Sequence, residues 1–263
     1  MTKTRLLRAS QAKAAAMGLA LAAVAIAAGT PAQATTVFST GFEPPGYSTG
    51  QLAGQAGWFN APNAFVQTTS VESGLQGVSV DPGALGQHVT YHSTSYNSVG
   101  DPNQLVTIST DFMLDSLGVG AVWEALAAIG NGGFITQLLV LSDTGQVCGF
   151  NPCNGPTLTA GTWYNLSMEL DYATGTVRDL VDGVEFSSGL FSNVPGHSTT
   201  LDFVGLGTNN TFMAGSTGKA SWDNLSVVSS GAPEPAAWTM MLTGFAVLGG
   251  VIRRRKAASW AAS

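Results

Sequence analysis

Basic residues are almost absent from the middle of this chain. Of the ten Lys and Arg, four lie in the first 13 residues and four lie at positions 253 to 256. Only Arg178 and Lys219 remain between Thr35 and Ser230, where there are fifteen Asp and Glu. A surface with this excess of acidic side chains repels phosphate groups and anionic lipid headgroups. Nucleic-acid binding is therefore not expected.

Charged residues of both signs are scarce, and they make up only 10% of the chain. The 33 Gly and the apolar fraction of 44% favour short strands around a hydrophobic core over helices. Apolar and polar residues alternate with a period of two in three segments, as strands require. These segments are Gln104–Leu114, Ile135–Ser142 and Trp163–Asp171.

Turn sequences follow these segments closely. "SDTG" begins at Ser142, "YATG" at Tyr172 and "VDGV" at Val181, and the Asp-Gly pair of the last suits a type I′ hairpin turn. About a dozen short strands in one stretch are typical of a sandwich. We therefore expect residues 35–230 to form an all-β domain, an antiparallel jelly roll of two sheets.

Cysteine is nearly absent too, with only Cys148 and Cys153 in the chain. In an exported protein these two would close a local disulfide around a Gly/Asn/Pro loop, and free thiols are the alternative. The stretch has too few ligands for zinc. No phosphate-binding glycine loop is present, and no Ser-His-Asp or Cys-His arrangement can be assigned from spacing.

The N-terminus has a basic start, an apolar run from Ala14 to Ala28, and then Ala32-Gln33-Ala34. This order is typical of a secretory signal peptide, here a helical segment within residues 1–34 that is cleaved after Ala34. A buried N-terminal helix is the alternative.

The C-terminus has an apolar run from Ala236 to Ile252, at the lower length limit for a transmembrane helix. The tripeptide Pro233-Glu234-Pro235 precedes the run, and Arg253-Arg254-Arg255 follows it as a basic stop on the cytoplasmic side. Together, residues 231–258 resemble the PEP-CTERM sorting signal, and residues 259–263 form a short tail beyond it. The resemblance implies export across the inner membrane of a Gram-negative bacterium, anchoring there, processing by an exosortase, and delivery to the envelope or exterior.

Three further segments resemble the concanavalin A-like, laminin-G-type jelly roll. They are "GFEPPGYSTGQLAGQAGW" (Gly41–Trp58), "GTWYNLSMELDYATGTVRDLVDGVEF" (Gly161–Phe186) and "ASWDNLSVV" (Ala220–Val228). Many members of that family bind glycans, often with calcium. The resemblance implies that the first and last strands are neighbours, and that Glu43 and Asp223 meet at calcium, the one candidate cofactor. The alternative is that Glu43 is a turn residue and Asp223 faces solvent.

Glycoside hydrolases of this fold carry two nearby carboxylates. Here Glu169 and Asp171 share a strand face but no second Glu follows, so the catalytic pair is incomplete. His88 and His92, four apart on a strand, have Cα atoms about 13 Å apart and cannot share a metal ion. We therefore expect no catalytic residues and a protein that is not an enzyme, with a divergent glycan hydrolase as the alternative.

Sugar binding requires exposed aromatic rings. The candidates are Tyr91, Tyr96, Trp123 and Phe150, whereas Trp58, Trp163 and Trp222 are expected in the core. The sequence thus predicts an exported structural or adhesive matrix protein. Its loops near Cys148–Cys153 would be able to bind extracellular polysaccharide.

Overall fold

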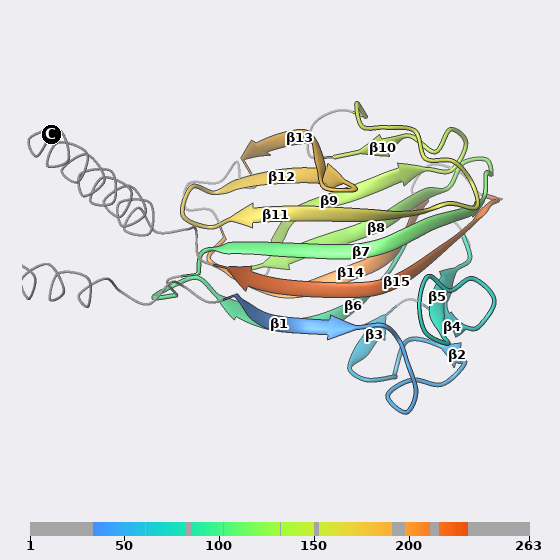
Figure 1. Cartoon of the computed structure of the whole chain (residues 1–263), viewed down its shortest axis with the longest axis horizontal. Helices are drawn as coiled ribbons and strands as arrows, with labels where there is room; N and C mark the ends of the chain where they lie inside the picture. The colour runs from blue at the N-terminus through green and yellow to red at the C-terminus, as the bar shows by residue number, and fades with distance from the viewer. Residues whose placement is uncertain are drawn as a thin grey trace, which may run out of the picture. The chain divides into compact units, whose positions relative to one another are not determined.

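The computed structural model is built from strands in two layers (Figure 1). It describes residues 34–60, 62–82, 86–101, 103–131, 133–149, 153–190, 198–210 and 216–230. Within these residues no helix is long and apolar enough to cross a membrane. The expected signal peptide (all but Ala34) and the expected transmembrane helix lie outside the described part of the chain.

The larger layer, sheet A, contains nine of the described strands. Eight are hydrogen-bonded in the order β13 (Val184–Leu190), β12 (Thr176–Val181), β11 (Trp163–Asp171), β7 (Leu105–Ser116), β15 (Lys219–Ser230), β5 (Gly77–Val80), β4 (Ala64–Gln67) and β2 (Gly50–Gln51). The ninth, β1 (Thr35–Thr40), pairs antiparallel with β15. The first and last strands of the domain are therefore neighbours, as the jelly-roll resemblance implies.

The smaller layer, sheet B, contains six described strands and lies behind sheet A in Figure 1. Their order is β10 (Val147–Cys148), β9 (Gly133–Leu141), β8 (Val122–Gly130), β14 (Thr200–Asn210), β6 (Gly86–Asn97) and β3 (Trp58–Asn60). All the described pairings in both sheets are antiparallel. The prediction of an all-β sandwich of two antiparallel sheets is confirmed.

The core lies between the two sheets and has large aromatic rings at its centre. Trp222 contacts Phe112 edge to face with ring centroids 5.0 Å apart, and Trp123 with centroids 6.2 Å apart. The Trp222 indole N–H donates to the carbonyl of Ala125 across the sandwich, at 3.0 Å. Burying rings of this size is a large part of the stabilisation that a sandwich can obtain.

The predicted turns join strands of the structure. Segment 142–145 connects β9 to β10, and segment 172–175 connects β11 to β12. Between β12 and β13, Asp182 (φ 50°) and Gly183 (φ 76°) both adopt the left-handed conformation. Two consecutive left-handed residues define a type I′ turn, which explains the Asp-Gly pair. The three predicted strands correspond to β7, β9 and β11.

Candidate functional site

The outer face of sheet B carries the most distinctive set of side chains. On β14, Val204 and Leu206 belong to the core, so strand alternation directs Phe203, Gly205 and Gly207 outward. Residues paired across strands share a face, and the register therefore identifies the outward residues of the neighbouring strands.

An apolar row crosses this face, formed by Phe59, Phe203, Ile129 and Phe134. Phe203 pairs with Ile129 of β8, and Ile129 pairs with Phe134 of β9. Phe59 of β3 contacts Phe203 across β6, with ring centroids 5.5 Å apart. Phe59 is 36% exposed and Phe134 is 58% exposed. From β3 to β9 the row spans four strand spacings, about 19 Å.

Tyr91 of β6 lies beside the apolar row, with its ring centroid 6.1 Å from that of Phe59. It pairs with Gly205, and a Cβ atom at Gly205 would be only 2.6 Å from Cδ1 and 2.8 Å from Cε1 of the Tyr91 ring. The ring therefore lies across β14, in space that any residue other than glycine would fill.

Glu124 of β8 lies on the far side of β14 from Tyr91. A bulge between Glu124 and Leu126 places both Ala125 and Leu126 in the core, so that Glu124, paired with Gly207, faces outward. The Glu124 side chain is nevertheless fully buried. Burial, and secondly the negative charge of Glu124, raise the pKa of Tyr91 to about 12. Tyr91 is therefore a protonated phenol at neutral pH, close to a buried carboxylate.

Of the three described aromatic residues that were predicted to bind sugar, Tyr91 alone lies on this face. Tyr96 is buried, and its hydroxyl donates to the carbonyl of Asn103 at 2.6 Å. Trp123 is buried in the core. Both predictions are wrong because strand alternation turns these rings inward. Phe150 lies outside the described residues.

The tryptophans expected in the core are buried at positions 58 and 222. Trp163 is instead half-buried, because it pairs with Met113 on the outer face of sheet A. Phe59, Phe134, Phe203 and Glu124 could not be recognised as site residues from the sequence, since they come from four strands that only the register brings together.

Asp223 lies on the opposite side of the molecule, in sheet A, and is fully buried. Its Oδ2 accepts the backbone N–H groups of Glu72 and Ser73, each at 3.1 Å, and its Oδ1 accepts that of Asn224 at 2.8 Å. Burial raises the pKa of the Asp223 carboxyl, the three N–H donors oppose the shift, and the Glu43 charge adds to it.

Glu43 binds the same loop from its other end. Its Oε1 accepts the backbone N–H groups of Leu75 at 2.8 Å and Gln76 at 3.1 Å. The sequence thus correctly brought Glu43 and Asp223 together, but both carboxylates hold a loop in place. No group of three or more His, Cys, Asp or Glu in the described residues is arranged to hold a metal ion. The calcium site expected at Glu43 and Asp223 stays a prediction, and the backbone N–H groups bonded to these carboxylates compete with it for the same oxygen atoms.

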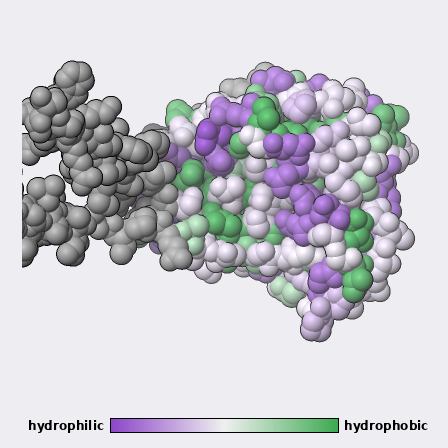
Figure 2. All heavy atoms as spheres, in the orientation of Figure 1, coloured by the Kyte–Doolittle hydropathy of each residue, from purple (hydrophilic) through white to green (hydrophobic). Residues whose placement is uncertain are grey.

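Acidic side chains are also common on the outer face of sheet A, where Figure 2 shows hydrophilic residues gathered. Glu169 forms an ion pair with Arg178, which also contacts Glu185 at 3.5 Å. Asp171 accepts the backbone N–H groups of Ala173 and Thr174 in the following turn. Both carboxylates of the incomplete catalytic pair thus have structural partners.

The two histidines lie on β6, at positions paired with inward residues of β14. His92 is half-buried, and its ring stacks on that of Phe38 with ring centroids 3.9 Å apart. Its Nε2 lies 3.1 Å from the carbonyl oxygen of Ala56.

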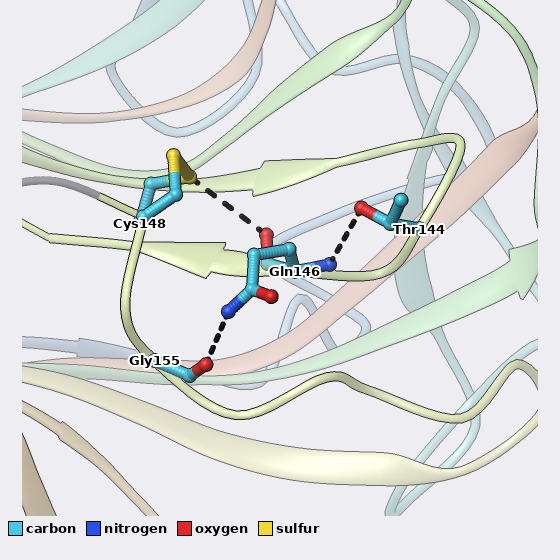
Figure 3. Close-up of a disulfide and its surroundings, with 5 residues drawn as sticks. Thr144, Gln146, Cys148 and Gly155 are labelled. Carbon is cyan, nitrogen blue, oxygen red and sulfur yellow. Dashed lines mark hydrogen bonds between the residues drawn. A yellow bond between two sulfur atoms is a disulfide. The ribbon is translucent and has the colours of Figure 1, made fainter.

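The predicted disulfide between Cys148 and Cys153 is present (Figure 3). Gln146 supports the loop next to it: its side-chain amide donates to the carbonyl of Gly155, and its backbone N–H donates to Thr144 Oγ1 at 3.2 Å. The disulfide therefore constrains the chain at the end of β10, one of the two edge strands of sheet B.

No family model and no curated protein matches this chain. Among solved structures, a sialidase is similar to 65% of the chain at 14% identity and a TM-score of 0.47, and the match covers 17% of the sialidase. A carbohydrate esterase from Shiga toxin-encoding bacteriophage phi24B is similar to 75% of the chain at 16% identity and a TM-score of 0.49, over its full length. The cellulose-induced protein Cip1 is similar to 72% of the chain at 15% identity and a TM-score of 0.49, over 96% of its length.

At identities this low, the roles of residues in these structures cannot be assigned to residues of this chain. The similar structures nevertheless include proteins named as enzymes, the sialidase and the esterase. The expectation that this protein is not an enzyme is therefore not retained.

Proposed function

We propose that the protein is an exported, glycan-active β-sandwich that binds polysaccharide across the outer face of sheet B. The observation that carries this proposal is the apolar row, which lies beside Tyr91 and Glu124. Pyranose rings have an apolar face that packs on aromatic rings, and their hydroxyl groups bind nearby polar groups. An apolar row about 19 Å long suits an extended chain of sugars better than one small ligand.

The Tyr91–Glu124 pair is the reactive centre in this proposal, and hydrolysis is the reaction. Tyr91 donates its proton to the glycosidic oxygen as that oxygen's bond to the sugar carbon breaks. Glu124 accepts a proton from the water whose oxygen bonds to that carbon. Because Glu124 is buried, binding of the sugar must open a path for water to the carboxylate.

Release of reducing ends from a panel of polysaccharides by the full chain tests this chemistry. Tyr91→Phe keeps the ring and should preserve binding, but it should lower turnover by about a hundredfold or more. Glu124→Gln should have a similar effect. The matched control is Glu169→Gln, which removes a surface carboxylate and should leave turnover unchanged. Turnover unaffected by Tyr91→Phe and Glu124→Gln contradicts the reactive centre.

The route to the cell surface is a separate part of the proposal, supported by sequence alone. The signal peptide directs export, the inner membrane holds the C-terminal segment, and an exosortase processes the chain near Pro233-Glu234-Pro235. Intact mass of the protein from cells with and without the exosortase tests this route. A product that retains residues 236–263 in both strains contradicts it.

A further inference from the structure

The positions of the Lys and Arg side chains in residues 35–230 determine which charge class of glycan the outer face of sheet B can accept. We infer that this face takes a neutral polysaccharide of pyranose rings and rejects uronate or sialylated chains. The inference rests on the proposed function, and it adds the charge class of the substrate.

Neither Lys nor Arg of the domain lies on sheet B. Arg178 is on β12 of sheet A, where Glu169 and Glu185 already surround it. Lys219 begins β15, also in sheet A, and pairs with Ser116. The sequence has no other Lys or Arg between residues 35 and 230, including the segments that the structure does not describe. An anionic sugar on sheet B therefore has no Lys or Arg of the domain to bind.

Histidine does not replace the missing cations on the described part of this face. His88 and His92 pair with Thr208 and Val204, two inward residues of β14. Paired residues share a face, so both histidines lie on the side of β6 that faces the core. His92 is also packed against Phe38.

A carboxylate sugar bound on this face would be desolvated without a charged partner. Proteins that recognise carboxylates usually supply Arg or Lys, and an unpaired charge is costly to remove from water. Glu124 adds a negative charge under the same face, so it repels an anionic chain. Contact with Phe59 and Phe134, in contrast, requires no charge on the sugar. The apolar row thus favours a neutral ring.

Two oligomers of equal length that differ only at C6 provide the sharpest test. One is a β-1,4-linked glucan, and the other is the same glucan oxidised at C6 to the glucuronate. Calorimetric titration of the full chain should show that the neutral oligomer binds at least about tenfold more tightly, a difference of about 1.4 kcal/mol. Its affinity should not depend on salt, and EDTA should change nothing.

Two variants locate the binding. Phe134→Ala removes an exposed ring of the apolar row and should weaken binding of the neutral oligomer about tenfold. Val184→Ala removes an exposed apolar side chain at the edge of sheet A and should have no effect. Binding of the glucuronate oligomer that is as tight as that of the neutral one and depends on Phe134 overturns the inference and leaves the proposed function standing. Failure of both oligomers to bind overturns the proposed function itself.

Discussion

The ring of Tyr91 lies across Gly205, where a Cβ atom would come within 2.6 Å of it. Gly205 pairs with Tyr91 and Gly207 pairs with Glu124, so these two positions of β14 place no side chain on this face between the two residues. Tyr91 thereby lies beside Phe59 of the apolar row and close enough to Glu124 for that charge to raise the pKa of the phenol. Gly205 has a steric role on the face that we propose to be functional.

Gly205→Ala should displace the Tyr91 ring and destabilise the fold by about 1–3 kcal/mol, because the new methyl group overlaps Tyr91 and Val89. Chemical denaturation measures the change in the free energy of unfolding. The matched control is Gly133→Ala on β9, where the nearest atom to a Cβ is 3.9 Å away. Equal stabilities of the two variants contradict the packing of Tyr91 on Gly205.

The Tyr91 phenol should lose its proton at a higher pH than an ordinary tyrosine. Its pKa is raised from 10.0 to about 12, so the stability that its proton contributes is complete below pH 10 and is lost as the pH rises towards 12. NMR of ring-labelled tyrosine, assigned with Tyr91→Phe, gives the pKa directly. Glu124→Gln should lower it but leave it above 10, because burial is the larger cause. A pKa of 10 in the folded protein contradicts this environment.

Asp223→Ala should cost about 3 kcal/mol or more in the free energy of unfolding, because three backbone N–H groups lose a charged acceptor. Asp143→Ala, at an exposed turn residue, is the control and should change stability by less than about 0.5 kcal/mol. Calcium and EDTA should leave the Tm of the unaltered protein unchanged. A rise in Tm with calcium that disappears in Asp223→Ala would confirm the calcium site.

Replacing both Cys148 and Cys153 with serine should lower stability by about 2 kcal/mol, the value for closing so short a loop. Glycan binding should persist, since the apolar row comes from other strands. Denaturation and titration of the same variant measure both effects. Complete loss of binding in a folded variant would move the site to the disulfide loop, where the sequence placed it.

The sequence predicted those parts of the fold that depend on neighbouring residues. Period-two alternation identified β7, β9 and β11, and the Asp182-Gly183 pair identified a type I′ turn from its backbone requirements. The disulfide joins cysteines five positions apart, so it too is local information.

The sheet B face could not be predicted in the same way. Phe59, Phe203 and Phe134 are far apart in the chain, and only the register of five strands brings them to one face. Alternation alone also misplaced Tyr96, because it does not tell which of the two faces is buried. For Asp223, resemblance identified the correct neighbour, Glu43, but not the backbone donors of the loop that occupy both carboxylates.

The claim that the sheet B face binds polysaccharide is tested most directly by mapping amide chemical-shift changes in the full chain as a neutral β-1,4-glucan oligomer is added. The largest changes should fall around Phe59, Tyr91, Phe134 and Phe203, on four strands of sheet B. Changes confined to sheet A or to residues 146–155, or no change at saturating oligomer, would contradict the account.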